Sequence, residues 1–258
     1  MKPLRQLDAR AVRAVLFDID DTLTTAGKLT AQAYEALEAL HRSGRSTVAV
    51  TGRHAAYCDQ LARLWPVDAV VGENGGFYFW FSEGRLHRQY REAENIRARN
   101  LERLALIGRK IAAAVPGCAI PAGERYRDTD LAIDYAEEVT PLPLETAERI
   151  AALLRAEGLN VTMSSIHVHG WFGNYDKLAT VRELLLERFG MDSDQTRAAA
   201  LYVGDSPNDA SMFAFFPNSV GVANVRRFAG RMPAEPTYVT DAAFGAGFAE
   251  LAQHLLRS

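Results

Sequence analysis

Residues 12–23 read VRAVLFDIDDTL, a short apolar run that ends abruptly in acidic side chains. The consecutive apolar residues from Val15 to Phe17 are typical of a strand that is buried on both faces, as in a parallel sheet. Asp18 and Asp20 follow where this strand gives way to a loop. The stretch therefore predicts a central strand of an α/β sheet with two carboxylates at its carboxyl end.

The same pattern continues on both sides of a long middle segment. Short apolar strands alternate with amphipathic helices, and this alternation is typical of a parallel α/β sheet. We therefore predict a doubly wound, mainly parallel, Rossmann-like α/β core. The expected strands are 12–19, 46–50, 68–71 and 199–203, and the expected helices are 30–42, 54–64, 177–189 and 243–256.

The middle segment has a different character. It follows an aromatic stretch at residues 77–81 and begins with a charge-rich helix expected at 93–114. Its strands, including 130–135, look half exposed rather than fully buried. We therefore predict an inserted α+β cap at 84–168, and a core made of 1–83 and 169–258.

Composition excludes several classes of protein. The chain has 258 residues, of which 48% are apolar and 24% are charged, and its net charge is -3. This balance gives no footprint for nucleic acid or an anionic membrane surface. The two cysteines, Cys58 and Cys118, suggest neither a disulfide framework nor a zinc site. We expect a cytoplasmic monomer or homodimer with no nucleic-acid or membrane partner.

Polar residues follow three of the predicted core strands. Asp18 and Asp20 follow the first, Thr51 the second, and Asp205 the strand at 199–203, with Asp209 close behind. Ligands of open α/β sheets bind beyond the carboxyl ends of the strands. Carboxylates gathered there repel one another unless a cation neutralises them, and hard oxygen ligands suit Mg²⁺.

These residue types fit phosphoryl transfer. A carboxylate that attacks phosphorus divides hydrolysis into two displacements through an aspartyl-phosphate. One of Asp18 and Asp20 can be nucleophile and metal ligand while the other serves as acid and base. Thr51 and Lys177 could hold the transferring oxygens, whose charge must be stabilised throughout the reaction.

Four segments resemble the motifs of the haloacid dehalogenase (HAD) superfamily in the right order. They read DIDDTL at 18–23, VTGR at 50–53, YDKL at 175–178 and GDSPND at 204–209. An insert between the second and third motifs, preceded by ENGG at 73–76, is similar to that of the Cof-type branch, subfamily IIB. Members of this branch include sugar-phosphate phosphatases and phosphomannomutases.

The resemblance implies a role for each matching residue. Asp18 would be the nucleophile, and Asp20 would protonate the leaving oxygen and then activate water. The remaining roles are phosphate binding by Thr51, Gly52 and Lys177, support by Asn208, and Mg²⁺ ligation by Asp18, Asp20, Asp205 and Asp209.

Each residue also has a simpler interpretation. Thr51 could cap the following helix, Lys177 could be an ordinary surface lysine, and Asp205 or Ser206 could be a helix cap. His167 and His169 alternate on one strand face, but no third ligand at suitable spacing supports zinc. We expect surface or hinge positions for these histidines, with lining of the substrate pocket as the alternative. The candidate substrate contacts are Arg53, Asn74, Arg125, Arg127 and His167.

We therefore predict a magnesium-dependent phosphatase that acts on a small phosphorylated metabolite, chiefly a sugar phosphate. Two alternatives remain open from the sequence. A phosphomutase of the phosphomannomutase type would use the same four motifs, and a protein that has lost catalysis could still bind a phosphate ligand.

Overall fold

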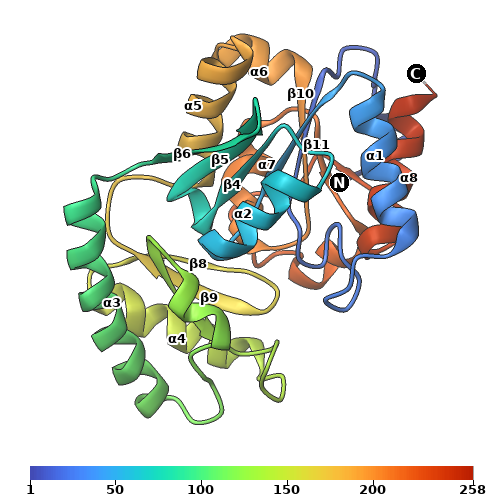
Figure 1. Ribbon diagram of the computed structural model, residues 1–258. Helices are drawn as coiled ribbons and strands as arrows, with labels where there is room; N and C mark the ends of the chain where they lie inside the picture. The colour runs from blue at the N-terminus through green and yellow to red at the C-terminus, as the bar shows by residue number, and fades with distance from the viewer. Residues whose placement is uncertain (258) are drawn as a thin grey trace.

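The computed structural model describes residues 1–257, and its strands form two separate sheets (Figure 1). The larger sheet has nine strands in the order β1-β12-β11-β10-β2-β3-β4-β5-β6. The first seven strands in this order, from β1 through β12 to β4, pair in parallel. At the other edge, β5 pairs antiparallel with both β4 and β6. Its strands are β1 (Lys2–Pro3), β2 (Ala14–Phe17), β3 (Ser46–Val50), β4 (Ala69–Gly72), β5 (Phe77–Ser82), β6 (Arg85–Tyr90), β10 (Ala200–Gly204), β11 (Ser219–Gly221) and β12 (Tyr238–Val239).

Helices cover both faces of this sheet, and alternate residues of β2 pack against different helices on the two faces. Val15 and Phe17 pack in the cluster that includes α1, α2 and α8. Ala14 and Leu16 pack on the other face, against α5 and α7. Side chains of a strand alternate between its faces, so all four are buried and the doubly wound prediction is confirmed. The helices are α1 (Ala31–Arg42), α2 (Ala55–Leu64), α5 (Lys177–Phe189), α6 (Ser193–Ala199), α7 (Ala210–Phe215) and α8 (Phe244–Leu256).

Local capping sets where the helices of the larger sheet begin. Thr30 caps α1 as its sequence position suggests, because its hydroxyl accepts a hydrogen bond from the Ala33 amide at 3.3 Å. The second helix begins one residue later than expected, since His54 lies outside it and caps it. The Nδ1 atom of His54 accepts from the Tyr57 amide at 3.1 Å.

The smaller sheet is antiparallel and has three strands in the order β7-β9-β8. Its core contains residues of α3 and α4, which lie beside it in Figure 1. Every residue of β7 and β9 is buried, so the expectation of half-exposed strands was wrong for these two. The elements are β7 (Asp130–Asp134), β8 (Asn160–Met163), β9 (His167–Trp171), α3 (Glu94–Ala114) and α4 (Leu144–Ala156).

Each sheet extends slightly past the boundaries expected for the cap. The larger sheet includes β6, which ends at Tyr90, because β5 and β6 form a hairpin around Glu83 and Gly84. The smaller sheet includes β9, which ends at Trp171. No helix within residues 1–257 is both long and apolar enough to cross a membrane.

Candidate active site

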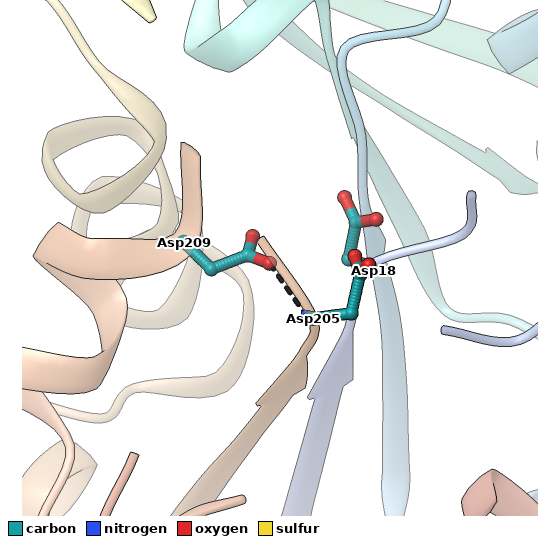
Figure 2. A group of neighbouring side chains, drawn as sticks. All are labelled: Asp18, Asp205 and Asp209. Atoms are coloured by element: carbon teal, nitrogen blue, oxygen red, sulfur yellow. Dashed lines mark hydrogen bonds between the residues drawn. The ribbon is translucent and has the colours of Figure 1, made fainter. Parts of the chain in front are cut away.

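Three carboxylates meet beyond the carboxyl ends of β2 and β10 (Figure 2). These strands are parallel neighbours, with Phe17 opposite Val203, so Asp18 and Asp205 leave the sheet side by side. Asp209 reaches the same place from the turn before α7. One carboxylate oxygen from each aspartate lies within 4.8 Å of the others, and all three residues are buried. The structure thus brings together acidic residues that lie far apart in the sequence.

One lysine faces these aspartates. Lys177 is the first residue of α5, and its Nζ lies 3.0 Å from Asp18 Oδ1 and 3.0 Å from Asp209 Oδ1. It is therefore no surface lysine, since it is only 3% exposed. Burial raises the pKa of Asp18 well above its usual range, although Lys177 opposes the shift. Burial and the neighbouring aspartates raise the pKa of Asp205 as well.

Hydrogen bonds fix the loop between β10 and α7. Asp209 Oδ2 accepts from the amides of Asp205 at 3.0 Å and Ser206 at 3.2 Å, and Tyr202 donates its hydroxyl proton to Asp209 Oδ1. Asn208 Oδ1 accepts from Ser206 Oγ at 2.9 Å, so Asn208 stabilises the loop. The side-chain carboxylate of Asp205 does not cap a helix. It accepts from Thr22 at 3.4 Å and Asn224 at 3.1 Å.

The end of β3 contributes Thr51 and Gly52. Thr51 is fully buried, and its Oγ1 accepts from the Arg53 amide at 3.1 Å. His54 caps α2, so the interpretation of Thr51 as that cap was wrong. A Cβ on Gly52 would lie 2.9 Å from His169 Nε2, so only glycine lets the chain pass this close to β9.

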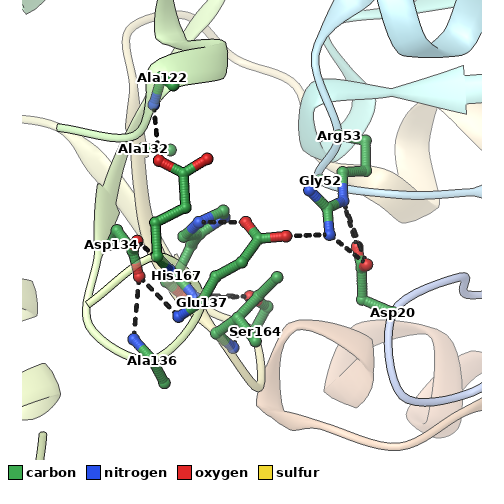
Figure 3. Close-up of polar contacts among 12 residues, drawn as sticks. Asp20, Gly52, Arg53, Ala122, Ala132, Asp134, Ala136, Glu137, Ser164 and His167 are labelled. Atoms are coloured by element: carbon green, nitrogen blue, oxygen red, sulfur yellow. Dashed lines mark hydrogen bonds and ion pairs between the residues drawn. The ribbon is translucent and has the colours of Figure 1, made fainter. Parts of the chain in front are cut away.

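Asp20 lies at the start of a chain of charges that crosses to the smaller sheet (Figure 3). Arg53 Nε lies 2.9 Å from Asp20 Oδ2, and Arg53 Nη2 lies 2.6 Å from Asp20 Oδ1. The same Nη2 is 2.6 Å from Glu137 Oε1, and Glu137 Oε2 is 3.0 Å from His167 Nε2. His167 is 4% exposed, which contradicts the expected surface position. Arg53 thus links Asp20, the expected general acid, to Glu137 in the segment that follows β7.

The buried carboxylate of Glu73 connects the larger sheet to the smaller one. Glu73 follows β4 and accepts hydrogen bonds from both sides of the junction, at distances of 2.6 to 3.2 Å. Its own backbone and that of Asn74 have positive φ angles of 43° and 56°, which few non-glycine residues adopt. The donors are the amides of Ala55, Asp128, Thr129 and Asp130 and the hydroxyl of Thr129.

Asp130 extends this junction towards the phosphate-binding loop. It accepts from Asn74 Nδ2 at 3.0 Å and Arg127 Nη1 at 2.6 Å, and it pairs with His169 Nδ1 at 3.2 Å. Arg127 Nη1 also donates to the carbonyl of Gly52 at 2.9 Å. Burial lowers the pKa of His169 to about 4, so this histidine is neutral at pH 7. We call the set of Glu73, Asn74, Arg127, Asp130 and His169 the buried joint.

The candidate substrate residues all line cavities, although two of them also belong to the buried joint. Asn74 and Arg127 are buried in the joint and form hydrogen bonds with protein groups. Arg53, Arg125, Arg127 and His167 line one cavity of about 270 Å³, and Asn74 lines another cavity beside Lys177.

Some important residues gave no signal in the sequence. Tyr202 reads as one more apolar residue of a buried strand, and Asn224 lies in a stretch with no motif. Glu137 looks like a surface acid, since Glu138 follows it and no apolar pattern surrounds them. Glu73 stands in the ENGG segment at 73–76, whose resemblance to other chains was the one available hint.

Comparisons with known proteins agree with this geometry. The model of the haloacid dehalogenase-like hydrolase family matches residues 15–99. A phosphoglycolate phosphatase from Haloarcula marismortui is 30% identical over 239 residues, which cover 92% of this chain and 94% of that protein.

Solved structures show the same fold at lower identity. A HAD/COF-like hydrolase from Plasmodium vivax is 17% identical, with 96% of each chain covered and a TM-score of 0.69. A HAD subclass IIB sugar phosphatase is 15% identical, with 94% of this chain and 98% of that chain covered and a TM-score of 0.62. The family match and the Haloarcula relative confirm the resemblance that the four motifs suggested, and the solved structures show the same fold.

Proposed function

The chain belongs to the haloacid dehalogenase-like hydrolases and is a phosphoric monoester hydrolase; we propose that it is magnesium-dependent and works through a phosphorylated Asp18. The observation that carries this proposal is the meeting of Asp18, Asp205, Asp209 and Lys177 in one buried site.

The donor set fits a divalent cation. Three buried carboxylates face a single ammonium group, so their ionised forms require further positive charge at this place. Oxygen ligands in this number suit Mg²⁺, which keeps several waters when it binds to proteins. Asp18, Asp205 and Asp209 would hold the ion, together with the main-chain carbonyl of Asp20. When bound, Mg²⁺ would neutralise charge on the transferring phosphoryl group.

In the first step, a carboxylate oxygen of Asp18 attacks phosphorus, and the bond to the leaving oxygen breaks. Asp20 donates a proton to that oxygen, so a neutral alcohol departs. Lys177 and Thr51 stabilise the negative charge of the phosphoryl oxygens, and the Gly52 segment places its backbone beside them.

In the second step, Asp20 takes a proton from water, and the water oxygen attacks phosphorus. The bond between Asp18 and phosphorus breaks, which releases phosphate and regenerates the carboxylate. A covalent intermediate of this kind divides one difficult displacement into two easier ones.

We further propose that segment 84–168 is a cap that covers the site and selects the leaving group. The contacts of Arg53 with Glu137 and of Gly52 with Arg127 support this role, because both cross from the larger sheet. A closed cap excludes bulk water and strengthens electrostatic interactions with the substrate.

The substrate is a small phosphorylated metabolite. The sequence favours a sugar phosphate, whereas the Haloarcula relative is named for phosphoglycolate. A panel of phosphate esters of both classes, assayed for released phosphate with Mg²⁺ and then with EDTA, tests the proposal. We expect Mg²⁺-dependent release from at least one ester. No release from any ester would contradict it, and a requirement for a bisphosphate activator would favour a mutase.

A further inference from the structure

Glu137 brings a carboxylate close to the proposed acid. Its Oε1 lies 2.6 Å from Arg53 Nη2, and its Oε2 lies 3.0 Å from His167 Nε2. The same Arg53 Nη2 is 2.6 Å from Asp20 Oδ1. A carboxylate that is not part of the catalytic set thus lies between a guanidinium and an imidazole, one side chain away from Asp20 (Figure 3).

A rigid turn holds Glu137 in this place. Asp134 at the end of β7 is fully buried and accepts from three successive backbone amides. Its Oδ1 accepts from Ala136 at 2.9 Å and Glu137 at 2.8 Å, and its Oδ2 accepts from Glu138 at 2.7 Å. The buried acceptor fixes the direction of the turn, so Glu137 is aimed at Arg53 by the fold.

Two cavities adjoin this contact. One, of about 330 Å³, is lined by Asp20, Thr24 and Ile166 among others. The second, of about 270 Å³, is lined by His54, Arg125 and His167 among others. Arg53 and Glu137 line both cavities, so their ion pair lies between them. A ligand that displaced Glu137 from Arg53 would therefore have space on both sides.

The partners of Glu137 indicate which ligand that would be. Guanidinium groups match carboxylates in shape and charge, and an imidazole can donate to the second oxygen. We infer that Arg53 and His167 form a leaving-group subsite for a substrate carboxylate, and that Glu137 competes with the substrate for them. This inference rests on the proposed function, because it places the leaving oxygen at Asp20.

The spacing favours short substrates. Asp20 and Arg53 are in direct hydrogen-bond contact, so a leaving oxygen bound to Asp20 and an anion bound to Arg53 lie only a few bonds apart. In phosphate esters of 2-hydroxy acids, one carbon separates the leaving oxygen from the carboxylate. A phosphorylated sugar has hydroxyl groups in place of that carboxylate. The substrate class that the subsite fits is therefore the phosphoesters of short 2-hydroxy acids.

The test compares phosphoglycolate with ethyl phosphate, in which a methyl group replaces the carboxylate. We expect wild-type kcat/KM to be at least about tenfold higher for phosphoglycolate, a difference of about 1.4 kcal/mol. Glu137→Gln should lower KM for phosphoglycolate about fivefold and leave ethyl phosphate unchanged, because a neutral amide competes less well for Arg53. Arg53→Met should remove the preference between the two esters.

Glu138→Gln is the matched control, because it removes the adjacent carboxylate, which accepts from the Ala122 amide at 3.0 Å instead. The preference should stay unchanged in this variant. The inference is wrong if wild-type enzyme prefers ethyl phosphate, or if Glu137→Gln raises KM for phosphoglycolate. A higher KM for a sugar phosphate in Glu137→Gln would instead show that Glu137 accepts hydroxyl groups.

Binding measurements separate this inference from the proposed function. Calorimetric titration of phosphoglycolate into Asp18→Asn, with and without Glu137→Gln, requires no turnover. Tighter binding in the double variant would support the subsite even if no ester were hydrolysed. Equal or weaker binding would overturn the subsite while leaving Mg²⁺-dependent hydrolysis of other esters intact.

Discussion

Two groups of buried charge lie close together, and they are balanced in different ways. At the ends of β2 and β10, three aspartates share a single lysine. In the buried joint, Glu73 accepts from four backbone amides and a hydroxyl, and Asp130 contacts Arg127, Asn74 and His169. The first group has more carboxylates than cations, whereas each carboxylate of the second accepts hydrogen bonds from several donors of the chain itself.

This difference teaches how to tell a reactive cluster from a structural one. A buried charge without a partner costs several kcal/mol, so a fold retains it only where a ligand compensates. A buried charge with complete hydrogen bonding can instead hold two parts of a chain together. Substitutions in the first group should therefore affect chemistry, and substitutions in the second should affect stability.

The largest effect expected is on turnover in Asp18→Asn. The amide cannot attack phosphorus, so kcat should fall on the order of 10⁴-fold or more. Thermal unfolding should show no loss of stability, because the substitution removes one of three crowded carboxylates. Asp8→Asn, at an exposed residue paired with Arg10, is the control and should keep full activity. A destabilised but active Asp18→Asn enzyme would reverse the assignment of the two groups.

The second effect expected is on folding in Glu73→Ala. The substitution leaves buried amides of residues 128–130 without an acceptor, and we expect a loss of about 3–5 kcal/mol in the free energy of unfolding. Glu73→Gln keeps one acceptor oxygen and should lose less. Urea denaturation measures both variants. Unchanged stability in Glu73→Ala would show that the joint does not hold the sheets together.

The sequence predicted the larger sheet better than the joint, for a physical reason. Strands β2, β3 and β10 are buried on both faces, so their apolar runs are visible in the sequence. The candidate site residues stand directly after these strands, where the topology of a parallel sheet brings them together. Asp18, Thr51 and Asp205 could therefore be located before any coordinates were known.

The joint could not be predicted in this way. Its members come from the end of β4, from β7 and its approach, and from β9, with Glu73 and His169 far apart along the chain. Polar side chains on β7 and β9 made these strands look half exposed. Both are buried, because their apolar face packs on α3 and α4 and Asp130 and His169 meet the loops after β4 and β3. In a sequence, a charged residue that pairs with a residue far along the chain looks the same as one that is solvated by water.

A smaller effect concerns pH and His169. Burial lowers the pKa of this histidine to about 4, whereas an unfolded chain has a value of 6.5. Between these values an unfolded chain binds more protons at this histidine than the folded state does, so the contribution of His169 to stability falls as pH falls from 6.5 to 4. We expect His169 to contribute about 3 kcal/mol to this loss.

His169→Gln should flatten the dependence of unfolding free energy on pH in this range, because it removes the buried imidazole. Denaturation curves measured at pH 4 to 7 give the two slopes. The same slope in His169→Gln and wild type would show that His169 already carries a proton in the folded joint.

The smallest effect expected is the stabilisation by Mg²⁺, and it tests both groups at once. A ligand that binds only the folded state at 100 times its Kd adds about 2.7 kcal/mol to the free energy of unfolding. Asp205→Asn should abolish this gain, because it removes a carboxylate of the site. Glu73→Ala should retain the gain in spite of its lower stability, since Glu73 lies in the joint and not among the three aspartates. If instead Mg²⁺ stabilised Asp205→Asn as much as wild type, the three aspartates would not be the site of the ion, and their uncompensated charge would need another explanation.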